Sequence, residues 1–391
     1  MKNFIRVSLL LLFFCIQKQR CHAQAATFEI SYIGTSEEAE TAIGYAADIW
    51  SQYLISDIPV KISVHFQLLT PGLLGITFPN GIMNFSGAEV SDIWYPTALA
   101  NAMAGTELNP GYADIEIYLN STMTWYFGTD GLVPAGKYDL VTVAMHEMGH
   151  GLGIIGLANK TGSEGSFGTI TADLFAPLTT SFPWPDLDTL PSIFDTYMED
   201  EGGSNLITYT NPSADLGAAF TSNNIWYNSP TSVIANDGSR PKIYAPATYA
   251  LGSSCTHLDE VTYPPGNENE LMTPNGTTGS AHQYPGPIVL GILSDIGWEV
   301  TEPVYVEGNN FISQLEINPN PASRNVSINV PPGHSVYKIE VFDINGRVMH
   351  TSKVNEIIDL YTIDTGNLLP GTYFVKIFTG DQSIQTKFLK L

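Results

Sequence analysis

Apolar and polar positions in the first third of the chain follow two different periods, and this pattern predicts a mixed fold. From Thr27 to Ile33 and from Pro59 to Leu69, apolar residues recur at every second position, as in half-buried strands. From Ser36 to Leu54 they recur every three or four residues, as on one face of a helix. Ala113 to Leu119 alternates again, and we expect the stretch near Ile115 to be the edge strand of a sheet. These elements predict an α+β arrangement.

The last quarter of the chain has a different pattern. It predicts a linker from residue 301 to residue 314, followed by seven short alternating strands in residues 315–391. Asn345-Gly346 lies between two apolar runs, which is a strong hairpin signal. Strands spaced in this way predict a small all-β sandwich as a separate domain.

A helix is predicted between these two regions, over the sequence DLVTVAMHEMGHGLG at residues 139–153. Asp139 suits its N-cap, and the glycines near its other end suit its termination. Helical residues four apart lie on one face, so His146 and His150 can direct their imidazole nitrogens at one point. That geometry suits zinc, which in catalytic sites takes three protein ligands and a water molecule. Glu147 then lies beside this water, where a carboxylate can take its proton.

Residues 1–25 are predicted to be a cleaved secretory signal. Lys2 and Arg6 precede the apolar run Val7 to Ile16, and the small-residue pattern Ala23-Gln24-Ala25 follows. A transmembrane anchor needs about 20 apolar residues, roughly twice the length of this run. We therefore expect an exported protein without a transmembrane anchor.

Charge and cysteine content limit the partners. Without the signal segment the chain has 12 basic and 39 acidic residues, a formal charge of −27. Nucleic acid is not an expected partner, because binding its phosphates needs clustered Lys and Arg. Calcium in acidic loops is compatible with this charge, but no calcium-loop motif supports it. Cys255 is the one cysteine left after cleavage, so a disulfide within the chain is not expected.

A third zinc ligand must come from outside the helix. In the extended metzincin pattern, His-Glu-x-x-His-x-x-Gly-x-x-His, a third histidine follows the glycine by three residues. Gly153 matches that glycine, but Gly156 occupies the position of the last histidine. We assign His65 to a strand and the histidines after residue 315 to the C-terminal domain, which leaves His257 and His282.

The order of the motifs favours His257. Metzincins have a methionine-containing turn after the third histidine, and His282 follows the methionine of ELMTP at 270–274, whereas His257 precedes it. The acidic alternatives for the third ligand are Asp173, Asp195 and Glu164.

Four motifs together resemble the leishmanolysin-type metzincins and their bacterial relatives: HEMGHGLG at 146–153, THLDE at 256–260, ELMTP at 270–274 and ILSDIGWEV at 292–300. In that family an inserted segment displaces the third histidine, and here it would span about residues 154–256. The resemblance implies a zinc metalloprotease domain over residues 26–300, with His146, His150 and His257 binding one zinc ion. It also implies Glu147 as the general base and Met272 as the methionine of the turn.

The inserted segment is rich in Gly, Pro, Ser, Thr and Asn, with a predicted helix at residues 212–220 and a predicted strand at residues 225–227. Such a segment suits the wall of a substrate cleft. Its aromatic residues line subsites or belong to the core, and core packing is the favoured interpretation for Phe182, Trp184, Trp226 and Tyr244.

Cys255 lies two residues before the proposed ligand His257. If this stretch were a strand, both side chains would point to the same side, and a thiolate would compete for zinc. A buried, inert thiol is the favoured interpretation.

Residues 315–391 contain NPNPASRNVSI, VFDINGRVM, LLPGTYFVKI and KFLKL, which resemble the C-terminal sorting domain of bacterial type IX secretion. The resemblance implies transport across the outer membrane by that machinery, followed by release or attachment to the cell surface. A carbohydrate-binding or spacer sandwich is the alternative.

Two classes of function fit these patterns. The favoured one is a secreted zinc-dependent metalloendopeptidase, in which Glu147 assists zinc-bound water in attacking a peptide bond of a protein or peptide substrate that extends along the edge strand near Ile115. The alternative is a cell-surface adhesin or binding protein with a structural zinc site. Glu147 favours the enzyme, because a closed structural site has no use for a carboxylate beside an open position.

Overall fold

The computed structural model describes residues 24–178, 189–301, 316–329, 335–343, 347–357, 360–379 and 383–391. The chain divides into two compact units, residues 1–301 and residues 302–391. The predicted signal segment up to residue 23, the predicted linker from residue 302 and the Asn345-Gly346 turn lie outside the described residues, as do Phe182 and Trp184.

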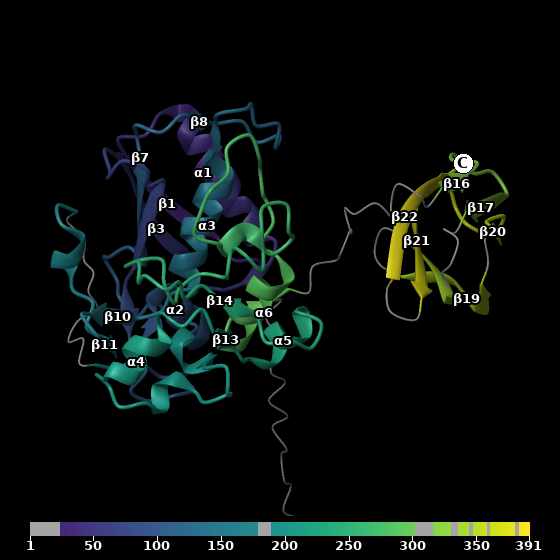
Figure 1. Cartoon of the computed structure of the whole chain (residues 1–391). Coiled ribbons are helices and arrows are strands. Elements are labelled where there is room, and N and C mark those ends of the chain that lie inside the picture. Colours follow the sequence, from purple (N-terminus) through teal and green to yellow (C-terminus); the bar gives the residue numbers. More distant parts are fainter. Residues whose placement is uncertain are drawn as a thin grey trace, which may run out of the picture. The chain divides into compact units, whose positions relative to one another are not determined.

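A four-stranded sheet forms the centre of the first unit (Figure 1). Its strands, in spatial order, are β1 (Phe28–Ile33), β3 (Val60–Gln67), β7 (Ile115–Asn120) and β4 (Gly75–Pro79). β1, β3 and β7 are parallel, whereas β4 runs antiparallel to β7. The three stretches predicted as strands form β1, β3 and β7.

Among the described residues, the edge strands of this sheet are β1 and β4, so the prediction of an edge near Ile115 is wrong. Ile115 belongs to β7, which pairs with β3 on one side and with β4 on the other. β4 was not predicted because its five residues, GITFP, include a glycine and a proline and do not alternate.

Two helices, α1 (Glu37–Ser51) and α3 (Leu140–Leu152), pack on one face of this sheet (Figure 1). The buried side of α1 carries four alanines, which let the helix approach its neighbours closely, and Ser36 caps its N-terminus. Trp50, at the other end of α1, is fully buried and donates its indole N–H to the Met145 carbonyl, 3.1 Å away. This bond ties α1 to the middle of α3.

The described residues of the first unit form four more helices and several short strand pairs. The helices are α2 (Thr97–Ala104), α4 (Ala214–Ala219), α5 (Pro230–Ala235) and α6 (Pro287–Ile296). The 3-10 turns are η1 (Ala172–Phe175), η2 (Phe194–Tyr197), η3 (Leu206–Thr208) and η4 (Glu270–Met272). The strands pair as β2 (Leu54–Ile55) with β15 (Glu299–Val300), β5 (Gly81–Ile82) with β6 (Tyr95–Pro96), β8 (Trp125–Tyr126) with β9 (Tyr138–Asp139), β10 (Ala158–Thr161) with β11 (Glu164–Phe167), and β12 (Met198–Glu199) and β14 (Lys242–Ile243) with β13 (Ile225–Tyr227).

The inserted segment covers the other face of the sheet near β4. Phe78 of β4 and Tyr118 of β7 form an apolar cluster there with Leu157 and Ile170 of the inserted segment. The helix and strand predicted in this segment correspond to α4 and β13. The unit is therefore mixed α+β, as predicted. The helices α1 and α3 pack on one face of the sheet, and the first part of the inserted segment packs on the other face near β4, whereas later parts of the segment join the same core as the helices.

The second unit is made of antiparallel strands. The described residues form the sheets β16-β17-β20 and β19-β18-β21-β22. The strands are β16 (Glu316–Asn318), β17 (Asn325–Asn329), β18 (Ser335–Asp343), β19 (Val348–Ile357), β20 (Leu360–Asp364), β21 (Gly371–Thr379) and β22 (Ser383–Lys390). Both sheets contribute to one apolar core, which includes Val326 and Ile328 from the first and Val341, Val375 and Phe388 from the second. The unit is an all-β sandwich.

Candidate metal centre

Helix α3 presents two histidines on one face. Asp139 caps it, as predicted, by accepting hydrogen bonds from the Thr142 N–H (3.1 Å) and hydroxyl (2.7 Å). Gly153 ends it with φ 136°, a conformation that side chains rarely adopt. The turn that follows brings the Ile154 carbonyl back to His150, whose Nδ1 donates to it over 2.6 Å.

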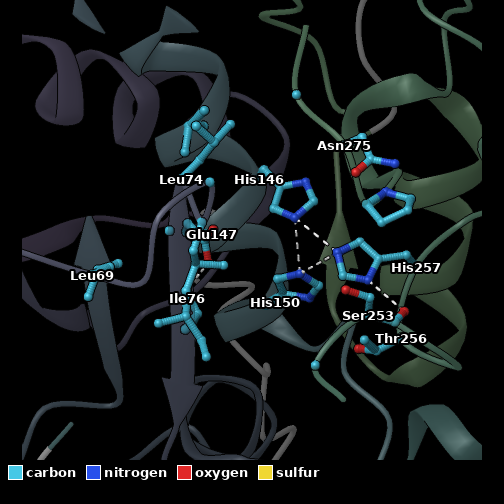
Figure 2. Close-up of a pocket in the computed structure, with 18 of the residues that line it drawn as sticks. Leu69, Leu74, Ile76, His146, Glu147, His150, Ser253, Thr256, His257 and Asn275 are labelled. Carbon is cyan, nitrogen blue, oxygen red and sulfur yellow. Dashed lines mark hydrogen bonds between the residues drawn. The ribbon is translucent and has the colours of Figure 1, made fainter. Parts of the chain in front are cut away.

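His257 reaches the same point from the end of the inserted segment. Its carbonyl accepts the Tyr244 N–H (2.9 Å), and the neighbouring Leu258 N–H donates to the Met272 carbonyl (2.8 Å). These bonds hold the backbone of His257 between the strand-like residues after β14 and the turn at Met272. Figure 2 shows His257 entering from this segment, coloured green, opposite the helix that carries His146 and His150.

The three imidazoles converge on one point (Figure 2). The Nε2 atoms of His146, His150 and His257 form a triangle in which each pair is 3.1 Å apart. Among the described residues, these three make up the group of histidine, cysteine and acidic side chains that is arranged to hold a metal ion.

The hydrogen bonds on the far side of each ring decide which nitrogen faces the centre. The Nδ1 atoms donate to backbone carbonyls: His146 to Leu271 (2.6 Å), His150 to Ile154 (2.6 Å) and His257 to Ser253 (2.9 Å). A carbonyl only accepts, so each Nδ1 carries the proton of the neutral ring and each Nε2 presents a lone pair. Three lone pairs 3.1 Å apart repel one another unless a cation lies between them.

These nitrogens fit zinc. Two ligands about 2.0–2.1 Å from zinc at a tetrahedral angle are separated by about 3.3 Å, close to the distances observed here. Carbonyl groups that hold the distal nitrogens are the usual outer partners of zinc-binding histidines.

Burial keeps the three rings neutral, which metal binding requires. It lowers the pKa of His146, and it lowers the pKa of His150 to about 3, with the His146 charge adding to the effect. Burial also lowers the pKa of His257 well below its usual value, with smaller contributions from the other two imidazoles.

Glu147 lies beside the histidines in the same cleft. Its side chain is buried, and its Oε2 accepts a hydrogen bond from the Thr77 hydroxyl of β4, 2.7 Å away. Burial raises the pKa of Glu147 to about 7, against the lowering effect of the Thr77 hydrogen bond. Sequence reasoning found Glu147 but missed Thr77, since no local pattern connects a threonine to a glutamate 70 positions away.

Met272 packs against α3 at Gly149. It is fully buried, and its Sδ lies so close to Gly149 that a Cβ on that glycine would be 2.6 Å from the sulfur. A side chain at position 149, next to His150, would therefore displace the methionine.

Gly156 stands at a close approach of two segments. A Cβ at this position would lie 2.6 Å from the Cys255 carbonyl oxygen and 2.7 Å from Oδ1 of Asp195. The position that carries the third histidine in the extended metzincin pattern is thus where the chain after α3 meets the loop that delivers His257.

The other candidate ligands lie outside the trio. Asp195 accepts the Leu157 N–H and both the N–H and the hydroxyl of Ser192. The Nδ1 atom of His282 lies 3.4 Å from Oε1 of Glu270. His65 lies in β3, where it stacks on Tyr118.

Cys255 is buried, and burial raises the pKa of its thiol well above the usual value. It does not belong to the metal-binding group of the described residues. Residues 255–257 do not form the strand on which the thiolate alternative depends, because Cys255 has φ 64° and lies in a turn.

A cleft of about 860 Å³ opens onto the trio. β4 and the loop before it form one side, with Leu69, Leu74 and Ile76 (Figure 2), and the inserted segment contributes residues around Ile170 and Phe175. Neither Trp226 nor Tyr244 lines this cleft, and Trp226 instead lies under the Arg240 guanidinium.

Comparisons with known proteins identify the second unit. Residues 316–390 match the family model described as a secretion system C-terminal sorting domain. This domain indicates type IX secretion, in which the chain interacts with the secretion machinery and crosses the outer membrane. Within the described residues, no helix has the length and apolarity to span a membrane. No curated protein matches the chain.

Similarities to solved structures are small and local. PorZ, a surface component of the type IX secretion system of Porphyromonas gingivalis, is 14% identical over 22% of this chain and 12% of its own, with a TM-score of 0.17. The CBM51-2 and INT domains of Clostridium perfringens ZmpB are 24% identical over 18% of this chain and 16% of theirs, with a TM-score of 0.14. CopC from Methylosinus trichosporium is 17% identical over 19% of this chain and 87% of its own, with a TM-score of 0.15. The chain thus spans less than a fifth of the first two structures, and none of the three assigns a fold to the first unit.

Proposed function

We propose that this protein is a secreted zinc-dependent endopeptidase whose first unit is a metzincin of the leishmanolysin type. The observation that carries the proposal is the convergence of the three Nε2 atoms, 3.1 Å apart, in a cleft that also contains the carboxylate of Glu147. His146, His150 and His257 hold the metal, and Met272 supports the helix that carries two of them.

The chemistry divides between the metal and the chain. When bound, zinc acts as a Lewis acid that polarises a carbonyl and lowers the pKa of a water molecule to about 7. Glu147 takes a proton from the attacking water as the water oxygen bonds to the carbonyl carbon of the peptide. It then gives that proton to the amide nitrogen as the C–N bond breaks, which releases a carboxylic acid and an amine. General acid–base catalysis of this kind contributes typically 10²–10⁴-fold to the rate.

The substrate backbone extends along β4. Within the part of the chain that the structure describes, this strand is one of the two edges of its sheet, with β7 on one side and the cleft on the other. An extended peptide can add to the backbone of an edge strand as a further strand. The docking edge for protein and peptide substrates is therefore β4 and not the strand near Ile115.

The ligand set favours an enzyme over an adhesin with structural zinc. Structural zinc sites are closed by four protein ligands, whereas catalytic sites use three. The group found among the described residues has three, and it opens onto a cleft of about 860 Å³. The buried carboxylate beside it has no role in a structural site.

Zinc content and proteolysis of a denatured protein, measured on the purified full chain, test this proposal. We expect about one zinc ion per chain, activity that a chelator removes and zinc restores, and a loss of roughly 10²–10⁴-fold in kcat for Glu147→Gln with zinc retained. His257→Ala is expected to lose zinc, whereas the matched control His65→Ala retains it, because His65 stacks on Tyr118 outside the trio.

Zinc-free active protein, or Glu147→Gln with wild-type activity, contradicts the peptidase proposal. Stoichiometric zinc without proteolysis of any denatured protein supports the binding-protein alternative.

A further inference from the structure

Two residues of β4, Thr77 and Gly75, contact the carboxylate of Glu147. Thr77 donates its hydroxyl to Oε2 over 2.7 Å, and both side chains are buried. Gly75 meets the same carboxylate from the other end of the strand. A Cβ on Gly75 would lie 2.5 Å from Oε1, 2.8 Å from Cδ and 2.9 Å from Cγ of Glu147.

The alternation of the strand explains why these two residues act together. Successive side chains of a strand point to opposite faces, so Gly75 and Thr77 share the face toward α3. Ile76 and Phe78 belong to the apolar cluster on the other face. A hydroxyl and an absent side chain, two positions apart, thus form the recess that receives the Glu147 carboxylate.

This recess fixes the direction of the carboxylate. A hydroxyl that donates to a carboxylate makes a short charge-assisted hydrogen bond, which fixes that oxygen and the plane of the group. Thr77 holds Oε2 and Oε1 lies against Gly75, so the strand fixes the positions of both oxygens. The side chain of a glutamate has three rotatable bonds, and without such a partner the carboxylate has no fixed direction.

We propose that Thr77 and Gly75 are positioning residues that set the direction of the Glu147 carboxylate, Thr77 through its hydroxyl and Gly75 through the space it leaves. This inference rests on the proposed peptidase function. It also makes β4 the element that aligns the base: β4 is paired in register with β7, with Thr77 opposite Ile117 and Gly75 opposite Leu119. The strand along which the substrate extends is thus the one that aligns the proton carrier.

The test uses the zinc-loaded full chain and three variants. Thr77→Val keeps the size and branching of the side chain but removes the hydroxyl. We expect kcat to fall roughly 10–100-fold with KM changed less than about threefold, because a misdirected catalytic group lowers the rate by up to about 10²-fold. Thr77→Ser restores the hydroxyl and is expected to remain within about threefold of wild type. Gly75→Ala is expected to lose kcat at least as strongly as Thr77→Val, because the atoms its Cβ meets are the flexible end of Glu147, which moves while the backbone stays.

A matched control and three further measurements separate positioning from folding. Thr41→Val removes a comparable threonine hydrogen bond on the exposed side of α1, to the Glu37 carbonyl at 2.9 Å, and is expected to retain wild-type kcat. Zinc content and thermal midpoint are expected to stay near wild type in all the Thr77 variants. Crystal structures of metal-free Thr77→Val and Thr77→Ser are expected to show the Glu147 carboxylate rotated in the first and unmoved in the second.

Two results overturn the inference: a Thr77→Val enzyme with wild-type kcat, or a Thr77→Ser enzyme as impaired as Thr77→Val. A failure of the inference differs from a failure of the proposed function. If Glu147→Gln is inactive while Thr77→Val is fully active, only the positioning role falls. If Glu147→Gln is itself active, the peptidase mechanism falls first.

Discussion

Replacing Gly156 by alanine tests how His257 is brought to the metal centre. An alanine Cβ here would lie 2.6 Å from the Cys255 carbonyl oxygen, whereas ordinary contacts of Cβ atoms begin near 3.4 Å. One of the two segments must therefore move by about 0.8 Å. The second obstacle, the Asp195 carboxylate, is held by hydrogen bonds from Leu157 and Ser192 and cannot swing away freely.

The structure sets the size of two expected effects of Gly156→Ala, one on the free energy of unfolding and one on zinc affinity. Overpacking against backbone costs about 1–3 kcal/mol, and the middle of this range changes the unfolding equilibrium about 30-fold. A shift of the Cys255 carbonyl also reaches His257, two residues later, whose Nε2 must lie about 2.0–2.1 Å from zinc if the site binds zinc as proposed. Disturbing the supports of a metal ligand typically weakens affinity 10–100-fold, and we expect a loss of this order.

Urea denaturation of the metal-free full chain measures the first effect, and zinc titration against a competing chelator measures the second. All six tryptophans of the sequence precede residue 301, so their fluorescence follows the first unit alone. Gly44→Ala in α1 is the control, since its Cβ would have its nearest neighbour, the Tyr32 hydroxyl, at 3.8 Å. Helix propensity predicts that this control is stabilised by up to about 1 kcal/mol. A Gly156→Ala protein that unfolds at the urea concentration of wild type and binds zinc as tightly would refute the reasoning.

Three further predictions concern other parts of the chain. Burial raises the pKa of Asp195 to about 7, so the folded state binds more protons than the unfolded state from about pH 4 to pH 7. The free energy of unfolding is therefore expected to fall as pH rises through this window, with a slope approaching about 1.4 kcal/mol per pH unit. Urea midpoints measured across this pH range check the prediction, and an equal slope in Asp195→Asn contradicts it. Cys255, buried with a raised pKa, is expected to resist a thiol reagent in the native protein and to react once the chain unfolds in urea; rapid native labelling contradicts its burial. Removal of residues 315–391 is expected to stop the chain in the periplasm, which immunoblots of cell fractions measure; normal surface delivery contradicts the sorting role.

Local features of the sequence predicted much of this protein correctly. The helix of residues 140–152, its Asp139 cap and its end at Gly153 follow from hydrogen bonds and backbone preferences within a few residues. The strands β1, β3 and β7 follow from alternation, and the seven strands of the described C-terminal residues follow from alternation and turn residues. His146 and His150 share a face because a helix turn spans about four residues.

Features that depend on distant pairing were predicted less well or not at all. The edge strand was placed at Ile115 rather than at β4, because the order of strands in a sheet depends on which chain segments pair, and alternation contains no information about pairing. Cys255 is buried, as the favoured interpretation predicted, and the loop that delivers His257 makes a turn there instead of the strand that the thiolate alternative requires. The third histidine was chosen by elimination and by motif order, and the role of all three as ligands stays a prediction.

The sequence alone determined which chemical groups the helix presents and how they are spaced, because helix geometry is periodic and local. Only the tertiary structure decided that His257 meets that helix a hundred residues later and that Thr77 and Gly75 contact the carboxylate of Glu147. Those contacts depend on the packing of β4 against α3 and on the close approach at Gly156, where the absence of a side chain lets two distant segments touch.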